Sequence, residues 1–430
     1  MKNVNFFAKA VSIYCICLLS ATVTVHSATK DMTNGKWTIR FNDETRKSEF
    51  VKDGTTILQD VSVKFKHNAS IIESSSYSDI KFSEENYSDA TGECKRFIIE
   101  YKNTENSTYP TIQQCFYLYP DKDYFLTDVF LLSSGTSKIE SNYIAPIYTE
   151  TQNRFLPQDA NNRFLFVPFD NDGFITYGSL PLSRGIDPTS LGVGRYARDT
   201  ISFEVTSIFN GETQEGLVIG SVEHDTWKSA IRMTGSPLSQ SYINKLECYS
   251  GATHSITRDA TDNNWLQPHG AVKGTKIKSA RMLVGLFDDW RTGMETFGDV
   301  NALIAPKREW NNPTPFGWNS WGGMERNINF DGVISVSDFI KENIQGKGHF
   351  GEDGLVFVGL DSFWDNLNWE QLKQFADYCK ANGQVPGIYW TPFCDWFPEN
   401  DRALEGNNGY FYSQTHLKVN GKTKKLCGAG

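Results

Sequence analysis

The spacing of apolar residues changes once along this chain, close to residue 288, and this change limits the folds that the chain can adopt. Before that point apolar and polar residues alternate in short runs, such as residues 36–41 and 61–66, separated by polar turns such as residues 52–54. Alternation with a period of two is typical of strands with one buried face. Many such strands in succession indicate a β-sandwich, so residues 28–285 are predicted to form a β domain of the two-sheet super-sandwich kind.

Beyond residue 288 a helical spacing replaces this alternation. Trp290, Met294, Phe297 and Val300 recur every three or four residues, which predicts a helix with Asp288 as its N-cap. Several prolines follow the helix. We therefore interpret residues 286–314 as a linker that contains a helix.

The last part of the chain alternates between strands and helices. Aromatic-rich strand signals occupy residues 316–321, 355–361 and 385–390, and helical patterns occupy residues 331–344 and 368–381. Alternating β and α segments indicate parallel strands joined by right-handed crossovers. The predicted fold class is thus multidomain: a β super-sandwich is followed by an incomplete (β/α)8 TIM barrel, with about its first three βα units in residues 315–430.

Each of these predicted strands ends in a residue suited to binding a sugar, namely Trp321, Asp361 or Tyr389. In α/β barrels the active site lies at the carboxyl ends of the strands. A carboxylate there accepts hydrogen bonds from neighbouring hydroxyl groups, and aromatic rings offer flat apolar faces to the C–H faces of sugars. The alternative for Asp361 is that it caps the turn after its strand. Alternation places Trp318 on the opposite face, which favours core packing for that residue.

Further aromatic residues follow the same strands. Trp364 and Trp390 are additional candidate substrate-binding residues. Trp390, Phe393 and Trp396 either line the mouth of a pocket or pack against a small hairpin, which the turn at residues 420–421 predicts.

The carboxylates in these loops do not form a recognisable pair. Glycosidases need two carboxyl groups, one as acid/base and one as nucleophile or base. Asp365, Asp395 and Glu399 lie in the right region, but no spacing singles out two of them, and solvated loop charge is the better interpretation. The catalytic residues are therefore unknown from the sequence.

Three short motifs resemble those of a known clan. Residues 317–321, Gly-Trp-Asn-Ser-Trp, resemble the first-strand motif of the α-galactosidase (melibiase) clan, glycoside hydrolase families 27 and 36. Residues 358–364 resemble its second-strand motif and residues 387–389 its third, so that the resemblance covers about a hundred residues. The β domain before them is similar in kind to the N-terminal super-sandwich of family 36.

The resemblance implies retaining hydrolysis of terminal α-galactosides without a metal ion or other cofactor. It implies that Trp321 packs against the galactose ring, that Asp361 binds the 4- and 6-hydroxyl groups, and that Tyr389 lines the pocket. One departure concerns Ser362, which stands where the family commonly has a second Asp. A related sugar or another α-glycoside therefore stays open as the substrate.

A second departure concerns the catalytic carboxylates. In the family the nucleophile ends the fourth strand and the acid/base lies near the sixth, whereas no fourth strand is recognisable in residues 315–430. A full barrel takes about 250 residues. The sequence thus predicts the N-terminal part of a glycosidase, truncated within the barrel and with little or no activity by itself. The alternatives are a non-catalytic carbohydrate-binding or surface protein, and another hydrolase such as an α-glucosidase-like enzyme.

The net charge and the N-terminal composition limit the partners and the cellular location that we expect for the protein. The net charge is −9 and there is no basic block, which disfavours nucleic acid as a partner and leaves an oligosaccharide or polysaccharide substrate. Lys2 and Lys9 precede a mostly apolar run over residues 10–25, and small residues near Ser27 suit cleavage, which predicts a cleaved signal peptide over residues 1–27. We expect a secreted or periplasmic protein without a membrane span and leave its oligomeric state open.

Six cysteines follow the predicted signal peptide, and their wide spacing matches no zinc motif. An exported protein can form disulfides. Cys94 with Cys115, and Cys394 with Cys427, are the candidate pairs. Buried free thiols are the equally weighted alternative for each pair.

Overall fold

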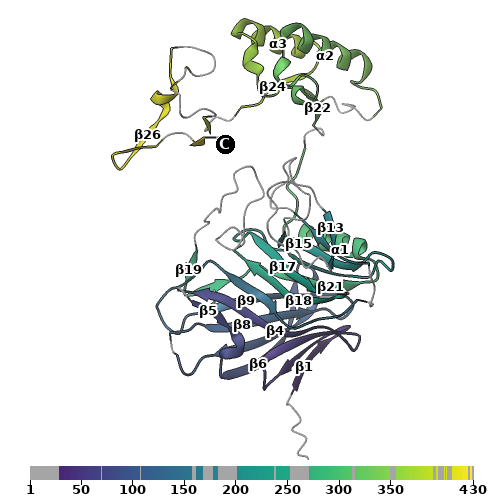
Figure 1. Ribbon diagram of the computed structural model, residues 1–430, viewed down its shortest axis with the longest axis vertical. Coiled ribbons are helices and arrows are strands. Elements are labelled where there is room, and N and C mark those ends of the chain that lie inside the picture. Colours follow the sequence, from purple (N-terminus) through teal and green to yellow (C-terminus); the bar gives the residue numbers. More distant parts are fainter. Residues whose placement is uncertain are drawn as a thin grey trace, which may run out of the picture. The chain divides into compact units, whose positions relative to one another are not determined.

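The structure is a computed structural model. The chain forms two compact units, Met1–Pro306 (unit 1) and Lys307–Gly430 (unit 2). Figure 1 shows the elements of each unit. The predicted signal peptide lies outside the described residues. Within the described part, no helix is both long and apolar enough to cross a membrane. The described residues are 29–68, 70–106, 108–156, 161–167, 178–182, 201–236, 239–251, 271–311, 315–348, 355–390, 394–395, 401, 403, 409–424 and 427–428.

Unit 1 is built from antiparallel strands in two large sheets. The first sheet has the order β1-β2-β3-β4-β11-β18-β17-β14, with β5 paired to β4. Its strands are β1 (Thr29–Asn34), β2 (Trp37–Asn42), β3 (Lys47–Lys52), β4 (Thr55–His67), β5 (Ser70–Glu73), β11 (Ile144–Thr149), β14 (Ile201–Phe203), β17 (Ser229–Ser236) and β18 (Ser239–Ser250).

The second sheet has the order β13-β12-β15-β16-β21-β9-β8-β7-β6, with β20 paired to β9. A further pair joins β10 (Ile139–Ser141) to β19 (Val272–Gly274). The strands of the second sheet are β6 (Asp79–Asp89), β7 (Gly92–Lys102), β8 (Thr111–Leu118), β9 (Tyr124–Leu132), β12 (Asn162–Phe166), β13 (Gly178–Pro181), β15 (Val205–Asn210), β16 (Gly216–Ser221), β20 (Lys276–Lys278) and β21 (Met282–Phe287).

The core of unit 1 lies between these two sheets. Trp37 and Phe50 of the first sheet meet the ring of Phe125 from the second sheet edge to face, at centroid distances of 4.9 and 5.1 Å. All three side chains are fully buried. Alternate residues of each strand therefore face the opposite sheet, and the predicted β-sandwich is confirmed.

Helix α1 (Trp290–Ile304) packs on the outer face of the second sheet. Its N-cap is Asp289, whose side chain accepts a hydrogen bond from the Arg291 N–H, so the predicted cap at Asp288 was wrong by one residue. A Cβ on Gly293 would lie 2.5 Å from the Phe287 ring, which is why the helix approaches the sheet at a glycine. The helix that was predicted within the linker therefore packs on the second sheet and belongs to unit 1.

Unit 2 contains a three-stranded parallel sheet in the order β22-β23-β24, formed by β22 (Phe316–Asn319), β23 (Val356–Leu360) and β24 (Val385–Ile388). Helix α2 (Phe330–Asn343) follows β22, and helix α3 (Trp369–Ala381) follows β23. This is the alternating order that the sequence predicts. The closed barrel itself stays a prediction.

Local signals explain where the helices of unit 2 begin and end. Asn329 caps α2 by accepting from the Gly332 N–H, and Asn368 forms a capping box with Gln371 at the start of α3. Gly383, with a φ of +75°, follows the end of α3. The buried cluster beneath the helices joins the sheet to both of them through Val333, Ile340, Val356, Val358, Leu360, Phe375 and Cys379.

Short elements complete the described part of unit 2. Strands β26 (Leu417–Val419) and β27 (Lys422–Lys424) form the predicted hairpin, in which Asn420 and Gly421 both have positive φ. Strands β25 (Cys394–Asp395) and β28 (Cys427–Gly428) pair in parallel, which places the backbones of the two cysteines opposite one another.

The other candidate disulfide, Cys94 with Cys115, is wrong. Both thiols are free and buried. Cys115 of β8 pairs with Ile98 of β7, so Cys94 lies four residues farther along that strand, or about 13 Å at the rise of a β-strand. A disulfide needs Cα atoms within about 7 Å. Burial raises the pKa of Cys94 to about 11 and that of Cys115 to about 12, as expected for inert core thiols.

Candidate functional site

The strand ends of unit 2 carry their polar groups on one face of the sheet. Trp318 and Val358 pack into the cluster beneath the helices, so their neighbours Asn319 and Gly359, which pair in register, lie on the opposite face. Asp361 comes two residues after Gly359 and therefore returns to that face. The placement of Trp318 in the core agrees with the alternation seen in the sequence.

Asp361 is held by three hydrogen bonds at the end of β23. The Asn319 side chain donates from Nδ2 to Oδ2 over 2.8 Å, and the Ser362 N–H donates to Oδ1 over 2.6 Å. The Asp361 N–H donates to Oγ of the buried Ser320 over 2.8 Å. The carboxylate is thus fixed across two strand ends and does more than cap its own turn, while each oxygen keeps a lone pair for another donor.

Trp321 lies beside this carboxylate through Asn319. Strand β22 ends at Asn319, two residues earlier than predicted, and Trp321 sits in a short 3-10 turn, η4 (Ser320–Gly322). Its N–H donates to Oδ1 of Asn319 over 2.8 Å. The Trp321 ring is 46% exposed and nearly parallel to the ring of Phe363, with centroids 6.4 Å apart and planes 10° apart.

Tyr389 continues the pairing of β24 with β23. Its N–H donates to the Leu360 carbonyl over 2.6 Å, which places Tyr389 next to Asp361 along the edge of the sheet. Its side chain is exposed. The structure therefore brings Trp321, Asp361 and Tyr389 to the same strand ends.

Trp364 and Trp390 are placed differently. Trp364 begins the turn η6 (Trp364–Asn366), and its ring is partly buried against the cluster beneath the helices, which favours packing over contact with a ligand. Trp390 is exposed and follows Tyr389 directly. Phe393, Trp396 and Glu399 lie outside the described residues, as does the side chain of Asp395; Asp365 is exposed.

Asn319 is the residue that the sequence reasoning missed. It belongs to the motif at residues 317–321, yet only its aromatic neighbours were singled out. Its amide bridges Asp361 and the backbone of Trp321, so one side chain orients both candidate binding groups. The available signal was alternation, which places a polar residue at the last position of β22 on the face opposite Trp318.

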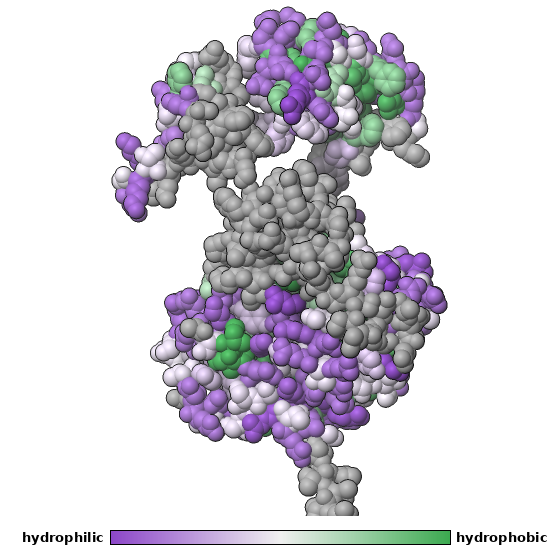
Figure 2. All heavy atoms as spheres, viewed as in Figure 1, coloured by the Kyte–Doolittle hydropathy of each residue, from purple (hydrophilic) through white to green (hydrophobic). Residues whose placement is uncertain are grey.

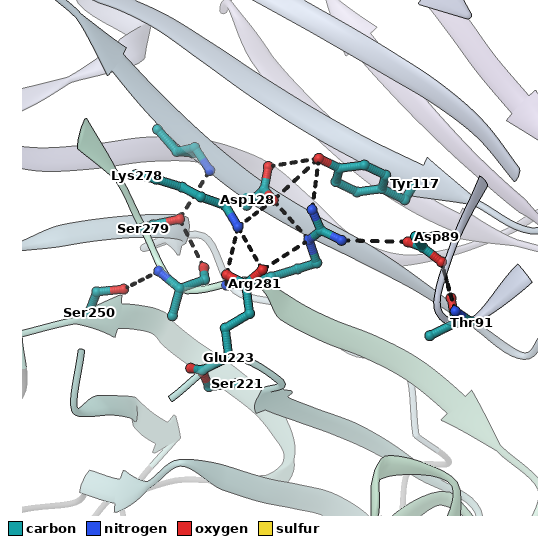
Figure 3. A network of polar contacts seen from close by, with 12 residues as sticks. Asp89, Thr91, Tyr117, Asp128, Ser221, Glu223, Ser250, Lys278, Ser279 and Arg281 are labelled. Atoms are coloured by element: carbon teal, nitrogen blue, oxygen red, sulfur yellow. Dashed lines mark hydrogen bonds and ion pairs between the residues drawn. The ribbon is translucent and has the colours of Figure 1, made fainter. Parts of the chain in front are cut away.

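A second polar cluster lies in unit 1, on the second sheet (Figure 3). Arg281 donates from Nε to the fully buried Asp128 over 2.9 Å and from Nη2 to the Tyr117 hydroxyl over 3.2 Å. Lys278 pairs with Glu223 at 2.6 Å and with Asp128 at 3.3 Å. Burial would lower the pKa of Arg281, but the charge and hydrogen bond of Asp128, together with Tyr117 and Glu223, outweigh it and leave that pKa raised. Each of these charges already has a partner inside the protein, which indicates a structural network.

A cavity of about 510 Å³ adjoins this network. Its polar lining is engaged as well: Trp227 donates from Nε1 to the Lys278 carbonyl over 2.8 Å. His224 contacts Glu204 through Nδ1 at 3.1 Å and Asn301 through Nε2 at 2.7 Å. The strand ends of unit 2 are therefore the better candidate site.

Comparison with known proteins gives fold-level likenesses. No protein-family model and no curated protein matches the chain. Among solved structures, it is similar to the α-N-acetylgalactosaminidase NagBb from Bifidobacterium bifidum in its Gal-NHAc-DNJ complex, with 12% identity and a TM-score of 0.49 over 93% of this chain and 64% of that chain. It is also similar to the family 36 α-galactosidases AgaB and AgaA from Geobacillus stearothermophilus, each with 10% identity over 85% of this chain, with TM-scores of 0.43 and 0.41 and coverage of 57% and 56% of those chains.

These structures include the family 36 α-galactosidases that the strand motifs resemble. The chain spans less than two thirds of the length of each of them. All three TM-scores lie below 0.5, so the function of this chain has to be argued from its own side chains.

Proposed function

We propose that this chain is part of a secreted, α-galactosidase-like glycoside hydrolase and that its strand ends bind the terminal hexose of an α-galactoside or a related α-glycoside. In this proposal β22, β23 and β24 are the first strands of a (β/α)8 barrel. The observation that carries the proposal is the Asp361 carboxylate, oriented by Asn319 and Ser362 on the same strand ends as Tyr389 and the exposed Trp321.

The arrangement suits a sugar because a hexose presents both hydroxyl groups and an apolar face. Each Asp361 oxygen accepts one N–H hydrogen bond from the protein and has a lone pair left for a hydroxyl donor. Hydrogen bonds to a charged acceptor are stronger than those between neutral groups. The ring of Trp321 supplies the flat apolar surface.

Bond cleavage requires more than this site offers in the described residues. Retaining hydrolysis uses two carboxyl groups about 5–5.5 Å apart. Asp361 is held by donors and acts as an acceptor, which is a binding role, and neither catalytic role is assigned to a residue of this chain. We therefore expect binding without appreciable hydrolysis from the 430-residue chain itself.

The same observation favours a second candidate, a carbohydrate-binding protein without hydrolytic activity. Both candidates use the same acceptor and the same aromatic ring. They differ in whether catalytic carboxylates act on the sugar that the site binds.

Calorimetric titration of the whole chain tests the shared part of the proposal. We expect saturable binding of methyl α-D-galactoside and weaker binding of methyl α-D-glucoside, whose 4-hydroxyl points the other way. Release of nitrophenol from an aryl α-galactoside, assayed in parallel, should stay near background. Binding of neither glycoside at millimolar concentrations would refute the proposal, and rapid release of nitrophenol would refute the binding-only role of this chain.

A further inference from the structure

Phe363 has a backbone conformation that is unusual for an aromatic residue. Its φ is +71° and its ψ is 15°, in the left-handed region. Bulky residues seldom adopt this conformation, because their Cβ crowds the backbone. The other non-glycine residues with positive φ in the described part of the chain are all polar or charged: Arg46, Asp53, Asp60, Asn68, Glu204, Gln214, Glu325 and Asn420.

Core packing does not account for this conformation. The Phe363 side chain is 40% exposed, whereas the next residue, Trp364, packs into the cluster beneath the helices. The left-handed turn therefore directs Trp364 inward and leaves the Phe363 ring at the surface. Strained backbone that is not explained by packing occurs preferentially at binding sites.

The Phe363 ring is continuous with the candidate site. It lies nearly parallel to the Trp321 ring, with centroids 6.4 Å and planes 10° apart. The Trp321 backbone is tied to Asn319, whose amide holds Asp361, and Phe363 follows Asp361 by two residues. The two rings and the carboxylate thus lie together on the loops after β22 and β23.

We propose that Phe363 is a specificity-determining residue that binds a second sugar ring, next to the hexose held at Asp361. This inference rests on the proposed function and deepens it, since it makes the preferred ligand a disaccharide or longer oligosaccharide. The second ring stacks its C–H face on the Phe363 ring, beside Trp321.

The experiment compares two ligands on the full chain and on three variants. The ligands are methyl α-D-galactoside and the disaccharide α-D-galactosyl-(1→6)-D-glucose, titrated by calorimetry. F363G removes the ring and places glycine at a positive φ, and F363N removes the ring while keeping a side chain that tolerates this φ. F339A truncates another exposed phenylalanine of unit 2, on α2, and serves as the control.

We expect the wild-type chain to bind the disaccharide about five- to tenfold more tightly than the methyl galactoside, the range expected from one aromatic stacking contact. F363G and F363N should abolish this advantage and leave the affinity for the methyl galactoside within about twofold. F339A should change neither affinity. The thermal midpoint of F363G should not fall, because glycine relieves the backbone strain.

Other outcomes overturn the inference. Equal loss of affinity for both ligands in F363G and F363N would show that Phe363 only supports the loop of Asp361. Wild-type binding of the methyl galactoside with no advantage for the disaccharide would refute the second subsite and leave the proposed function standing. Binding of neither ligand by the wild-type chain would refute both.

Discussion

The two units place their aromatic residues in opposite ways. In unit 1 the large aromatic side chains fill the space between the sheets, as Trp37, Phe50 and Phe125 do. In unit 2 the buried cluster is mostly aliphatic and the aromatic rings are displayed. Among the described residues, the exposed aromatic side chains all belong to unit 2: Trp310, Trp321, Phe339, Phe363, Trp369, Tyr378, Tyr389, Trp390, Tyr410 and Phe411.

The surfaces show the same difference. In Figure 2 the visible face of unit 1 is largely hydrophilic apart from one green patch, whereas on unit 2 green hydrophobic residues lie beside purple ones over a larger share of the coloured surface. Exposed apolar surface that the core does not use indicates recognition. Unit 1 thus uses its rings for stability, and we infer that unit 2 uses several of its rings for binding.

The two units also differ in how they hold a carboxylate: unit 1 pairs it with cations, and unit 2 holds it with neutral donors. Asp128 in unit 1 is paired with Arg281 and Lys278. Asp361 in unit 2 is held by neutral donors, the Asn319 amide and the Ser362 N–H. A charge held by neutral donors is oriented but not neutralised, so it remains available to ligand hydroxyl groups. The comparison therefore separates a structural carboxylate from a candidate binding carboxylate.

The largest effect is expected for removal of the structural carboxylate. D128A leaves Arg281 buried without its main counter-charge, which should reduce the free energy of unfolding by about 3–5 kcal/mol. Urea unfolding measures this loss. The control D121N removes the exposed carboxylate that pairs with Lys122 and should cost less than about 1 kcal/mol. A D128A variant as stable as D121N would contradict a structural role for the network.

A smaller effect on stability but a clear effect on binding is expected at Asn319. N319A removes the donor to Asp361 and the acceptor for the Trp321 N–H, and should weaken binding of methyl α-D-galactoside about tenfold. N319D keeps the acceptor but sets a second carboxylate against Asp361, so its loss of affinity should be larger. An N319D variant that binds better than N319A would show that Asn319 does not orient Asp361.

The smallest effect concerns His224 in unit 1. The Nδ2 of Asn301 donates to the Phe297 carbonyl, which turns its Oδ1 toward His224, so both ring nitrogens face acceptors and the charged imidazolium is favoured. Hydrogen bonding to Glu204 raises the pKa of His224 above 6.5. Burial alone would raise the pKa of Glu204, but the hydrogen bonds from His224 and Ser229 and the charges of Lys228 and His224 together outweigh it and leave that pKa lowered.

The sign of the pH dependence follows from these shifts. The contribution of His224 is fully present below pH 6.5 and is lost as the pH rises through its raised pKa, while Glu204 remains charged. Lys228 also lies near Glu204 and slightly opposes the charge on His224. H224Q should therefore cost stability at pH 6, by less than about 1 kcal/mol for this partly exposed pair, and cost less at pH 9. Thermal midpoints that show the reverse trend would contradict this protonation state.

Local patterns predicted much of the fold. Alternation over residues 28–285 indicated the sandwich, and the helical pattern over residues 368–381 predicted α3 almost to the residue. The order of strands and helices in unit 2 followed from the change of period. These features depend on neighbours within a few residues, which is what a sequence displays directly.

Contacts between residues far apart in the sequence could not be predicted from local patterns. Asn319 and Asp361 are 42 residues apart, and Arg281 and Asp128 are 153 apart. Phe363 is exposed and Trp364 is packed because the backbone of Phe363 is left-handed. A left-handed residue is usually predicted from a glycine or an asparagine, and neither stands at this position. The Cys94–Cys115 pairing failed for a related reason, because strand register rather than proximity along the chain decides it.

The most direct test of the binding carboxylate is the affinity of three proteins for methyl α-D-galactoside, measured by calorimetry. D361N keeps the shape of the side chain and removes its charge, whereas D365N does the same to an exposed carboxylate of the same loop. The account predicts that D361N binds about 10- to 100-fold more weakly than the wild-type chain and that D365N binds within about twofold of it. A D361N variant that binds as tightly as the wild-type chain would contradict the account.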